Sequence, residues 1–438
     1  MKWHRKTWML ALLAIIAVLP VLGIACGDDD DDDCCAHATT AATTADGSPT
    51  KAATKSPADE IANIKGDTTG VTDKEVKIGS YYAKTGPAAT YNTIQLAWNI
   101  YFDEVNKKGG IAGRQVKLIV EDDGYNPSNT VNVVKKLVEQ DQVFMIFNGL
   151  GTATSSAVAE YLKAQGVPSL FIASGASKWA HSGPTFIGIQ PDYTTEGAIL
   201  GKEMADKHKG KKYGILYQND DFGKDGREGI KQGAGTALTL VGEETYEANA
   251  ADITSQALKL INAGAEVIGV YSTPTQFAGM LKSVKAQGKT VAWYASSTTA
   301  GSAVAKLAEG AMDGVFSATY LPDVTDPSPE VQKVIQFYKD HGVANPNVYH
   351  LVAWAWAQHL ERLLTVTGKN LNRSSIIYAL ENLAFQGDWK ADLVFKPSIV
   401  TKDDHKVLEA MVIQKWNEAA GKFEYDLSKV VDSETTKR

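Results

Sequence analysis

Cysteine is almost absent from this chain. It contains three cysteines, and all of them, Cys26, Cys34 and Cys35, lie within the first 35 residues. The remainder can therefore form no disulfide within itself, and it can hold neither a catalytic thiol nor a cysteine-ligated metal. At 438 residues, the chain is long enough for a large core to supply the stability that small exported domains take from disulfides.

The motifs of the common enzyme classes are also missing. The sequence has no G-x-S-x-G, no H-E-x-x-H and no Walker loop, and Gly149-Leu150-Gly151 lacks the third glycine of a G-x-G-x-x-G. The eight histidines are scattered without metal-ligand spacing. These absences argue against an enzyme, and we expect neither a metal ion nor a cofactor.

An excess of positive charge is lacking as well. The formal net charge is −7, and the first 25 residues carry three positive and no negative side chains, so the rest carries about −10. Six of these negative charges form one run, Asp28–Asp33. The folded part is therefore only mildly acidic, which argues against nucleic acid as a partner.

The first 25 residues are typical of an export signal. Positive residues precede an apolar stretch from Trp8 to Val21, and small residues lead into Cys26. A permanent membrane helix is the alternative, because the apolar stretch is nearly long enough to span a bilayer. We favour a lipoprotein signal peptide at 1–25 with a lipid attached to Cys26, although Gly23 stands where such sites usually have leucine.

Residues 26–74 are predicted to be an acidic and Ala/Thr-rich disordered tether. The run of aspartates repels itself and cannot pack. From Ala36 to about Thr72 the sequence is rich in alanine, threonine, serine and glycine, and it has no apolar period. We therefore expect the folded region to begin near Val76.

From Val76 onward, short apolar runs alternate with helical patterns, which predicts an α/β fold. A first series of strands is expected at 76–79, 116–120, 143–147 and 170–172. A second series is expected at 213–217, 239–246, 267–271, 291–294 and 314–318. Two consecutive βαβ series imply two doubly wound parallel sheets with helices on both faces. After Tyr320 the pattern is mainly helical, and it ends in extended stretches at 391–395 and 406–416.

The loops that follow strands are the informative ones, because ligands of such sheets bind beyond the carboxyl ends of the strands. One of them, residues 148–156, reads NGLGTATSS and leads from an apolar strand into a helix. Its hydroxyl side chains could cap the helix, and the free N–H groups of a helix N-terminus could also receive an anion. The other loops are rich in tyrosine, serine, threonine and glycine and mostly poor in charge, which is typical of a neutral cleft with aromatic walls.

Six stretches between about Val76 and Glu424 carry a family resemblance. In order they are TGPAATY, NKKGGIAGRQVKLIVEDD, NGLGTATSSAVAEYL, GVPSLFIASGAS, YQNDDFGKDGREGIKQG and VYSTPTQFAGMLKSVKAQG. Together they resemble the type I periplasmic binding proteins of branched-chain amino acid ABC transporters, leucine-binding proteins among them. The resemblance implies two lobes joined by a three-stranded hinge, with the ligand held between them. Lobe one would comprise 75–191 and 320–390, lobe two 192–319 and 391–425, and a C-terminal tail 426–438.

The resemblance also implies which residues bind the ligand. The family holds a ligand carboxylate with a hydroxyl after the third strand, which maps to Thr152, and with a second hydroxyl and a backbone group, which map to Ser177 and Gly175. Two aromatic residues match positions that wall the ligand, with a looser third: Tyr91, Phe222 and Tyr271. With the resemblance in view, the turn at Thr152 is expected to receive an anion as well as to cap its helix.

One position departs from the amino-acid binders. In them an acidic residue of the second lobe pairs with the ligand ammonium, and the matching residue here is Ser296, with no acid between Gln276 and Glu309. A buried ammonium without a carboxylate partner costs several kcal/mol. The resemblance therefore implies a small carboxylate ligand, and recognition of an amino group is doubtful. Some of the stretches look more like the subgroup associated with hydrophobic or aromatic carboxylates.

Several further aromatic and acidic residues stand out in the sequence. Trp179 follows the Ser177 loop and either stacks on a ligand or packs against the edge of the lobe. Three aromatic residues on an apolar helix are interpreted as core: Tyr349, Trp354 and Trp356. The pair Asp122-Asp123 is interpreted as a surface or helix-capping feature rather than an acid–base pair.

These features predict a monomeric solute-binding lipoprotein, anchored by its lipid in the periplasm or on the outer face of a bacterial membrane. It would deliver a small carboxylate-bearing solute to the permease of an ABC importer by hinge closure, for which periplasmic binding proteins are the standard example. The alternative is a sensor, in which the same module presents its closed state to a membrane signalling receptor. Branched-chain amino acids, aromatic acids and short fatty acids are all compatible with the sequence.

Overall fold

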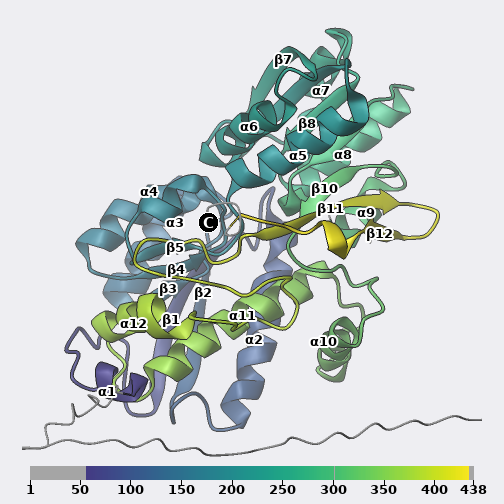
Figure 1. Cartoon of the computed structure of the whole chain (residues 1–438). Coiled ribbons are helices and arrows are strands. Elements are labelled where there is room, and N and C mark those ends of the chain that lie inside the picture. The colour runs from purple at the N-terminus through teal and green to yellow at the C-terminus, as the bar shows by residue number, and fades with distance from the viewer. Residues whose placement is uncertain (1–55, 300, 434–438) are drawn as a thin grey trace, which may run out of the picture. The chain divides into compact units, whose positions relative to one another are not determined.

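The computed structural model describes residues 56–299 and 301–433 (Figure 1). The predicted export signal, Cys26 and the first part of the predicted tether lie outside these residues. Within the described part of the chain, no helix is both long and apolar enough to cross a membrane.

The first series of strands forms a five-stranded parallel sheet in the order β2-β1-β3-β4-β5. The strands are β1 (Glu75–Tyr82), β2 (Gln115–Asp122), β3 (Met145–Phe147), β4 (Ser169–Ile172) and β5 (Phe186–Gly188). Helices α2 (Asn92–Lys107), α3 (Pro127–Lys135) and α4 (Thr152–Ala164) connect them. Every residue of β3 and β4 is buried, as expected for central strands of a parallel sheet. We call this sheet and the helices around it lobe one.

The second series forms a larger sheet in the order β12-β11-β10-β9-β8-β6-β7, with β13 paired to β11. Its parallel strands are β6 (Lys212–Gln218), β7 (Thr239–Tyr246), β8 (Val267–Tyr271), β9 (Ala292–Ala295) and β10 (Phe316–Thr319). The antiparallel strands are β11 (Ala410–Asn417), β12 (Lys422–Tyr425) and β13 (Val431–Asp432). The predicted α/β class is confirmed, but this sheet, which belongs to lobe two, is mixed rather than wholly parallel.

Five helices accompany the second sheet: α5 (Tyr193–His208), α6 (Asp221–Ala234), α7 (Thr254–Asn262), α8 (Pro274–Ala286) and α9 (Ser302–Ala308). Glycines bring α5 and α6 into close contact, since a Cβ on Gly229 would lie 2.2 Å from the carbonyl oxygen of Thr194. This packing places Tyr193 at the start of α5 against Phe222 at the start of α6, with ring centroids 4.8 Å apart.

Three helices follow the second series: α10 (Pro329–Asp340), α11 (Val348–Thr367) and α12 (Arg373–Ala379). Helix α11 packs along α2 of lobe one (Figure 1). Most of its residues are buried, which explains why its sequence is apolar on nearly every side. The chain therefore passes from lobe one to lobe two after β5, returns after β10, and crosses again before β11.

Residues 56–74 correct the predicted tether, because they belong to the folded unit. They include α1 (Pro57–Ile61), and the side-chain amide of Asn370 donates to the carbonyl oxygens of Ile61 and Ile64 at 2.6 and 2.9 Å. Asp67 pairs with Arg373 at 2.6 Å. Many of the contacts that hold this segment are hydrogen bonds to its backbone. Such contacts require no regular spacing of apolar residues, so the sequence pattern did not predict that the segment folds.

The C-terminal boundaries also differ from the prediction. The first part of 391–425, assigned to lobe two, lies against lobe one: Ser398 Oγ is 2.8 Å from the His359 ring, and His405 is 2.9 Å from Glu381. No strand forms at 391–395. The predicted tail begins at 426, yet β13 in that stretch pairs with β11 and extends the second sheet. Long-range pairing, which local periodicity does not report, decides these boundaries.

Candidate ligand-binding site

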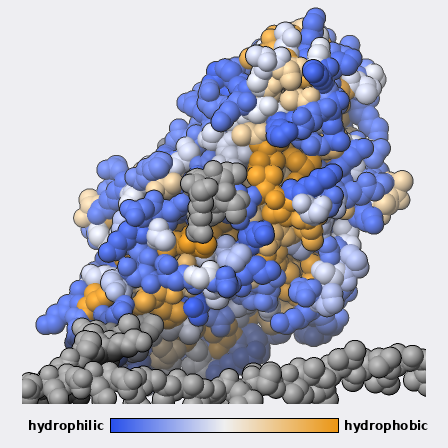
Figure 2. All heavy atoms as spheres, viewed as in Figure 1, coloured by the Kyte–Doolittle hydropathy of each residue, from blue (hydrophilic) through white to orange (hydrophobic). Residues whose placement is uncertain are grey.

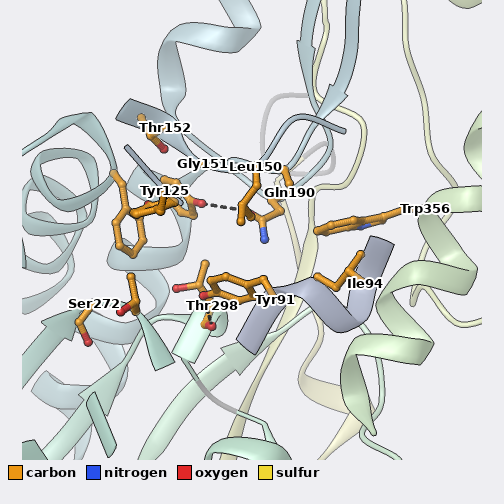
Figure 3. A pocket seen from close by; sticks show the side chains of 14 residues that line it. Tyr91, Ile94, Tyr125, Leu150, Gly151, Thr152, Gln190, Ser272, Thr298 and Trp356 are labelled. Atoms are coloured by element: carbon orange, nitrogen blue, oxygen red, sulfur yellow. Dashed lines mark hydrogen bonds between the residues drawn. The ribbon is translucent and has the colours of Figure 1, made fainter. Parts of the chain in front are cut away.

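A cavity lies where the carboxyl ends of the parallel strands of both lobes meet (Figure 3). The free space between its walls comes to about 40 Å³, so the side chains nearly close the cavity in this structure. Lobe one lines it with Tyr91, Ile94, Tyr125, Leu150, Gly151, Thr152, Ala173, Gln190 and Trp356. Lobe two lines it with Tyr193, Phe222, Ser272, Thr273 and Thr298. None of these lining residues carries a charge, so the cavity is neutral and rich in hydroxyl and aromatic groups.

The first turn of α4 forms one wall of the cavity. Its N-cap residue is Gly151, with φ 98° and ψ 156°, and no side chain caps the helix. A Cβ on Gly151 would lie 2.5 Å from the ring of Tyr125, so both the backbone angle and the space require glycine. The N-terminus of α8, where Ser272 and Thr273 line the cavity, contributes from the other lobe. Helix N-termini favour negative charge, so this end of the cavity suits an anion.

Thr152 offers a hydroxyl at this turn, and Figure 3 shows its oxygen turned toward the cavity. The Thr152 oxygen lies 2.7 Å from Ser174 Oγ. Ser174 Oγ already accepts the Trp179 ring N–H at 2.9 Å and the Ala176 backbone N–H at 3.2 Å, which occupies both of its lone pairs. The Ser174 hydroxyl must therefore donate to Thr152. This arrangement leaves the hydroxyl proton of Thr152 for a ligand.

Gln190 adds a second donor to the cavity. The Tyr193 hydroxyl donates to Gln190 Oε1 at 2.7 Å, which fixes the orientation of the amide. The amide nitrogen then points into the cavity, toward Tyr91 (Figure 3). The Tyr91 hydroxyl in turn donates to the carbonyl oxygen of Thr298 at 2.7 Å and so joins lobe one to lobe two at the cavity wall.

Asp122 and Asp123 shape the turn that carries Tyr125. Asp123 is buried rather than on the surface, and it accepts the Tyr125 backbone N–H at 2.9 Å and the Thr130 hydroxyl at 2.8 Å. Burial raises the pKa of the Asp123 carboxyl to about 6. Tyr125 itself has a φ of 58°, a left-handed angle that is uncommon for a residue with a side chain. The two aspartates therefore position a cavity residue.

Three of the residues implied by the resemblance line the cavity, namely Tyr91, Thr152 and Phe222. The structure does not bring the others to it. Ser177 donates its backbone N–H to Asp225 at 2.7 Å, and the carbonyl of Gly175 accepts the Tyr193 N–H at 2.8 Å. The hydroxyl of Ser296 is 3.1 Å from that of Thr298. These three residues support the walls without lining them.

The two remaining aromatic candidates are also structural. Trp179 is buried, donates to Ser174 and is not among the residues that line the cavity. Tyr271 lies beneath Phe222, with ring centroids 5.3 Å apart, and its hydroxyl donates to the Tyr193 carbonyl oxygen at 3.3 Å. Both side chains support the lining residues from behind.

The sequence reasoning missed several lining residues. Tyr125 lies three residues beyond β2, and its place in a loop after a strand was a usable signal. Gln190 follows β5, a strand of three residues that is too short to show a pattern. Trp356 was interpreted as core, since α11 is apolar on nearly all sides. It is indeed 1% exposed, but it also lines the cavity.

A buried acid stands behind the cavity in lobe two. Glu196 on α5 is fully buried and accepts both the backbone N–H of Ser297 at 2.6 Å and its hydroxyl at 3.0 Å. Burial raises the pKa of the Glu196 carboxyl to about 7. Glu196 neighbours Ser296, the position that matches the ammonium-binding acid, but it is not among the residues that line the cavity.

Contacts at the rim join the lobes on the side of α6. The short 3-10 helix Ser177–His181 of lobe one lies over the start of α6. Lys178 pairs with Asp221 at 2.7 Å and also donates to Ser156 at 2.5 Å. Together with the bond from Ser177 to Asp225, this contact joins lobe one to the start of α6, the helix that carries the cavity residue Phe222. Elsewhere in the described residues, no group of three or more histidine, cysteine or acidic side chains is arranged to hold a metal ion.

Two α/β lobes that enclose a neutral cavity between their strand ends define a solute-binding protein of the two-lobed class. The family model described as periplasmic binding protein matches residues 75–422, which is most of the chain. The chain belongs to this family. Its members are binding proteins, so the prediction that the chain is not an enzyme is confirmed by membership.

The relatives span more than one ligand chemistry. The Leu/Ile/Val-binding protein homolog 2 of Brucella abortus (strain 2308) is 26% identical over 316 residues, which are 69% of this chain and 81% of the relative. A fatty acid ABC transporter substrate-binding protein from Thermomonospora curvata superposes with a TM-score of 0.74 at 22% identity, covering 86% of this chain and 97% of that one. A solute binding protein of an ABC transporter from Rhodopseudomonas palustris BisB5, in complex with 3,4-dihydroxy benzoic acid, superposes with a TM-score of 0.71 at 18% identity, covering 82% and 98%. At these identities the solved structures establish the fold.

Proposed function

We propose that this protein is an extracytoplasmic solute-binding lipoprotein of an ABC importer, and that its ligand is a small carboxylate without an α-amino group. The observation that carries the proposal is a neutral cavity that meets an uncapped helix N-terminus at Gly151 and Thr152. A carboxylate placed there would accept the Thr152 hydroxyl and the free N–H groups of α4. Leucine, fatty acids and dihydroxybenzoate, the chemistries named for the relatives, all contain a carboxylate.

The α-amino group lacks a partner in the described part of the cavity. An ammonium taken out of water needs a carboxylate or several acceptors. No acid lines the cavity, and both oxygens of Glu196 already accept hydrogen bonds from Ser297. A zwitterion would therefore lose the solvation of its positive charge without compensation, whereas an acid without the amino group would not.

Calorimetry with matched pairs tests this proposal. The purified chain is titrated with 4-methylpentanoate against leucine, and with 3-phenylpropanoate against phenylalanine. We expect the acid that lacks the amino group to bind more tightly in both pairs. Tighter binding of the amino acid in both pairs would overturn the ligand assignment and would point to Glu196 as the ammonium partner after a rearrangement of Ser297.

The transport role is tested separately from the ligand. If the protein serves an importer, its ligand-bound form stimulates ATP hydrolysis by the reconstituted permease complex encoded beside its gene. If the protein is a sensor module, a receptor kinase encoded nearby responds to its ligand-bound form instead. A gene neighbourhood with a receptor and no permease would favour the sensor.

A further inference from the structure

A second chamber adjoins the ligand cavity. Its free space also comes to about 40 Å³, and it shares five lining residues with the first chamber: Tyr91, Ile94, Gln190, Thr298 and Trp356. Its remaining walls come mainly from α11, with Val348, Tyr349 and Val352, and from the crossing after β10, with Tyr320 and Leu321. The five shared residues make the two chambers neighbours, so the far end of a ligand in the first chamber would lie beside the second.

Two donors at this second chamber have nothing to donate to. The hydroxyl of Tyr349 and the ring N–H of Trp356 are both buried, and neither has a hydrogen-bond partner within the described residues. The two side chains are 6% and 1% exposed. Tyr349 lies edge-on to Tyr91, with ring centroids 5.6 Å apart, so its ring is held by packing. Buried donors are rarely left unpaired in folded proteins, and acceptor atoms on a ligand would supply the missing partners.

The chemistry of the chamber indicates which acceptor fits. None of the residues described as lining it is charged, and its walls combine aliphatic and aromatic side chains with uncharged polar ones, among them Gln190, Ser297 and Thr319. Glu196, an acid, accepts hydrogen bonds from Ser297 in the wall of this chamber. A second carboxylate would be desolvated there without a cation, whereas an uncharged oxygen would need only the two N–H and O–H donors.

We propose that the second chamber is a specificity subsite for an uncharged oxygen at the far end of the ligand. The ligand is then an elongated acid, with its carboxylate at the N-terminus of α4 and a hydroxyl or carbonyl oxygen beside Tyr349 and Trp356. This inference rests on the proposed function, because it takes the carboxylate end as given. It specifies the length of the ligand and a second polar group on it, neither of which follows from the fold.

Three acids of equal head group test the subsite by calorimetry on the full chain. They are 3-phenylpropanoate, 3-(4-methylphenyl)propanoate and 3-(4-hydroxyphenyl)propanoate, where the methyl compound matches the size of the hydroxyl compound. We expect the hydroxyl compound to bind roughly five- to tenfold more tightly than the methyl compound, as for one or two added hydrogen bonds.

Four variants assign this preference to the two donors. Trp356→Phe and Tyr349→Phe each keep an aromatic ring and remove one donor, so the ratio of the two affinities should fall toward one. Trp354→Phe and Tyr338→Phe are matched controls: the Trp354 N–H donates to Asp392 at 3.0 Å, and Tyr338 has a buried unpaired hydroxyl but lines neither chamber. Both controls should keep the ratio of the parent protein.

The outcomes separate this inference from the proposed function. Equal binding of the methyl and hydroxyl compounds, or a preference that survives in both Trp356→Phe and Tyr349→Phe, overturns the subsite and leaves the carboxylate assignment intact. If none of the three acids binds, the proposed function falls, and the subsite falls with it.

Discussion

Thr152 shows how a single hydroxyl is prepared for a ligand. Its proton is free because Ser174 donates to its oxygen, and Ser174 is obliged to do so because Trp179 and Ala176 fill its lone pairs. Through Ser174, the buried Trp179 side chain thus fixes the direction in which the Thr152 hydroxyl donates. Thr152 lies at an uncapped helix N-terminus, where free backbone N–H groups can bind the same ligand as its hydroxyl.

Replacing Thr152 with valine should weaken carboxylate binding about tenfold or more. The change keeps the shape of the side chain and removes one hydrogen bond to a charged group, which is worth about 1.5–3 kcal/mol. Calorimetry with 3-phenylpropanoate measures the effect. Thr365→Val, at an exposed position on α11, is the matched control and should bind as the parent does. An unchanged affinity in Thr152→Val would remove this residue from the site.

Glu196 should make the stability of the protein depend on pH near neutrality. Its pKa is raised by burial from the usual 4.5 to about 7, so the folded state keeps a proton that the unfolded state has already lost. Between pH 4.5 and 7 the contribution of Glu196 to stability therefore decreases as the pH rises. We expect the melting temperature to fall between pH 5 and 8, and to fall less in Glu196→Gln.

Calorimetric scans of both proteins across this range provide the measurement. Glu203→Gln serves as the control, since Glu203 lies on the same helix and forms an ordinary ion pair with Lys207. Parallel pH profiles for the parent and Glu196→Gln would show that another group titrates.

At the scale of elements, short segments without periodic sequence do much of the positioning. The 3-10 helix Ser177–His181 crosses to α6 of lobe two, and residues 56–74 bind along α12 and the loop before it. Several polar contacts hold each segment, and residues 56–74 also bury Ile61. The contribution of each contact to stability or binding can therefore be measured by substituting one residue at a time.

Lys178→Ala should accelerate ligand release. The ion pair with Asp221 forms only while the two lobes are together, so its loss destabilises the ligand-bound state relative to the open one. A half-exposed pair contributes at most about 1 kcal/mol, so the dissociation rate should rise up to about fivefold. Stopped-flow fluorescence measures the rate. Lys202→Ala removes an ion pair within α5 and should leave it unchanged.

High salt supplies a second check on the same contact. Screening weakens exposed ion pairs, so the difference between Lys178→Ala and the parent should shrink as salt is added. A difference that persists at 1 M salt would assign the effect to packing rather than charge.

Removal of residues 1–74 should destabilise the folded unit relative to removal of residues 1–55. The longer deletion takes away Asp67, the partner of Arg373, and the backbone carbonyls that Asn370 and Asn372 bind. Differential scanning calorimetry of the two truncated proteins should give a lower melting temperature for the longer deletion. Equal melting temperatures would mean that this segment contributes nothing to the fold.

At the scale of the whole molecule, the binding site exists only because three crossings of the chain bring two sheets to one cavity. Two hydrogen bonds cross between the lobes at this cavity. Tyr91 of lobe one donates to Thr298 of lobe two, and Tyr193 of lobe two donates to Gln190 of lobe one. The face of the molecule seen in Figure 2 is mostly hydrophilic, with hydrophobic residues gathered mainly near its middle. The cavity, in contrast, combines both kinds of group in one enclosed space.

Cys26→Ser should release the protein from the membrane without changing the affinity for its ligand. The prediction follows from the sequence alone, because Cys26 lies outside the described residues. A lipid on this cysteine would be the anchor, and the binding site lies in the folded unit that begins at residue 56. Fractionation of cells into membrane and soluble parts tests it. A signal-cleaved Cys26→Ser protein that still sediments with membranes would contradict the lipid anchor.

Local sequence determined the class of the fold. Apolar runs such as 143–147 identify buried strands, and alternation of strands with amphipathic helices leads to parallel sheets because each helix carries the chain back to start the next strand in the same direction. Composition alone excluded disulfides in the folded region, since no cysteine follows Cys35. The loop at 148–156 was recognised because a strand end and a helix start flank it directly.

Tertiary structure alone decided which side chains meet at the cavity. Ser177 and Trp179 follow a strand just as Thr152 does, yet the Ser177 backbone N–H bonds to Asp225 of α6 and the Trp179 ring bonds to Ser174. Gln190 and Trp356 reach the cavity from a crossing and from an apolar helix, where no periodicity marks them. Periodicity reports which face of an element is buried, because burial is a local property. It does not report what that face is buried against, because the partner comes from hundreds of residues away in the chain.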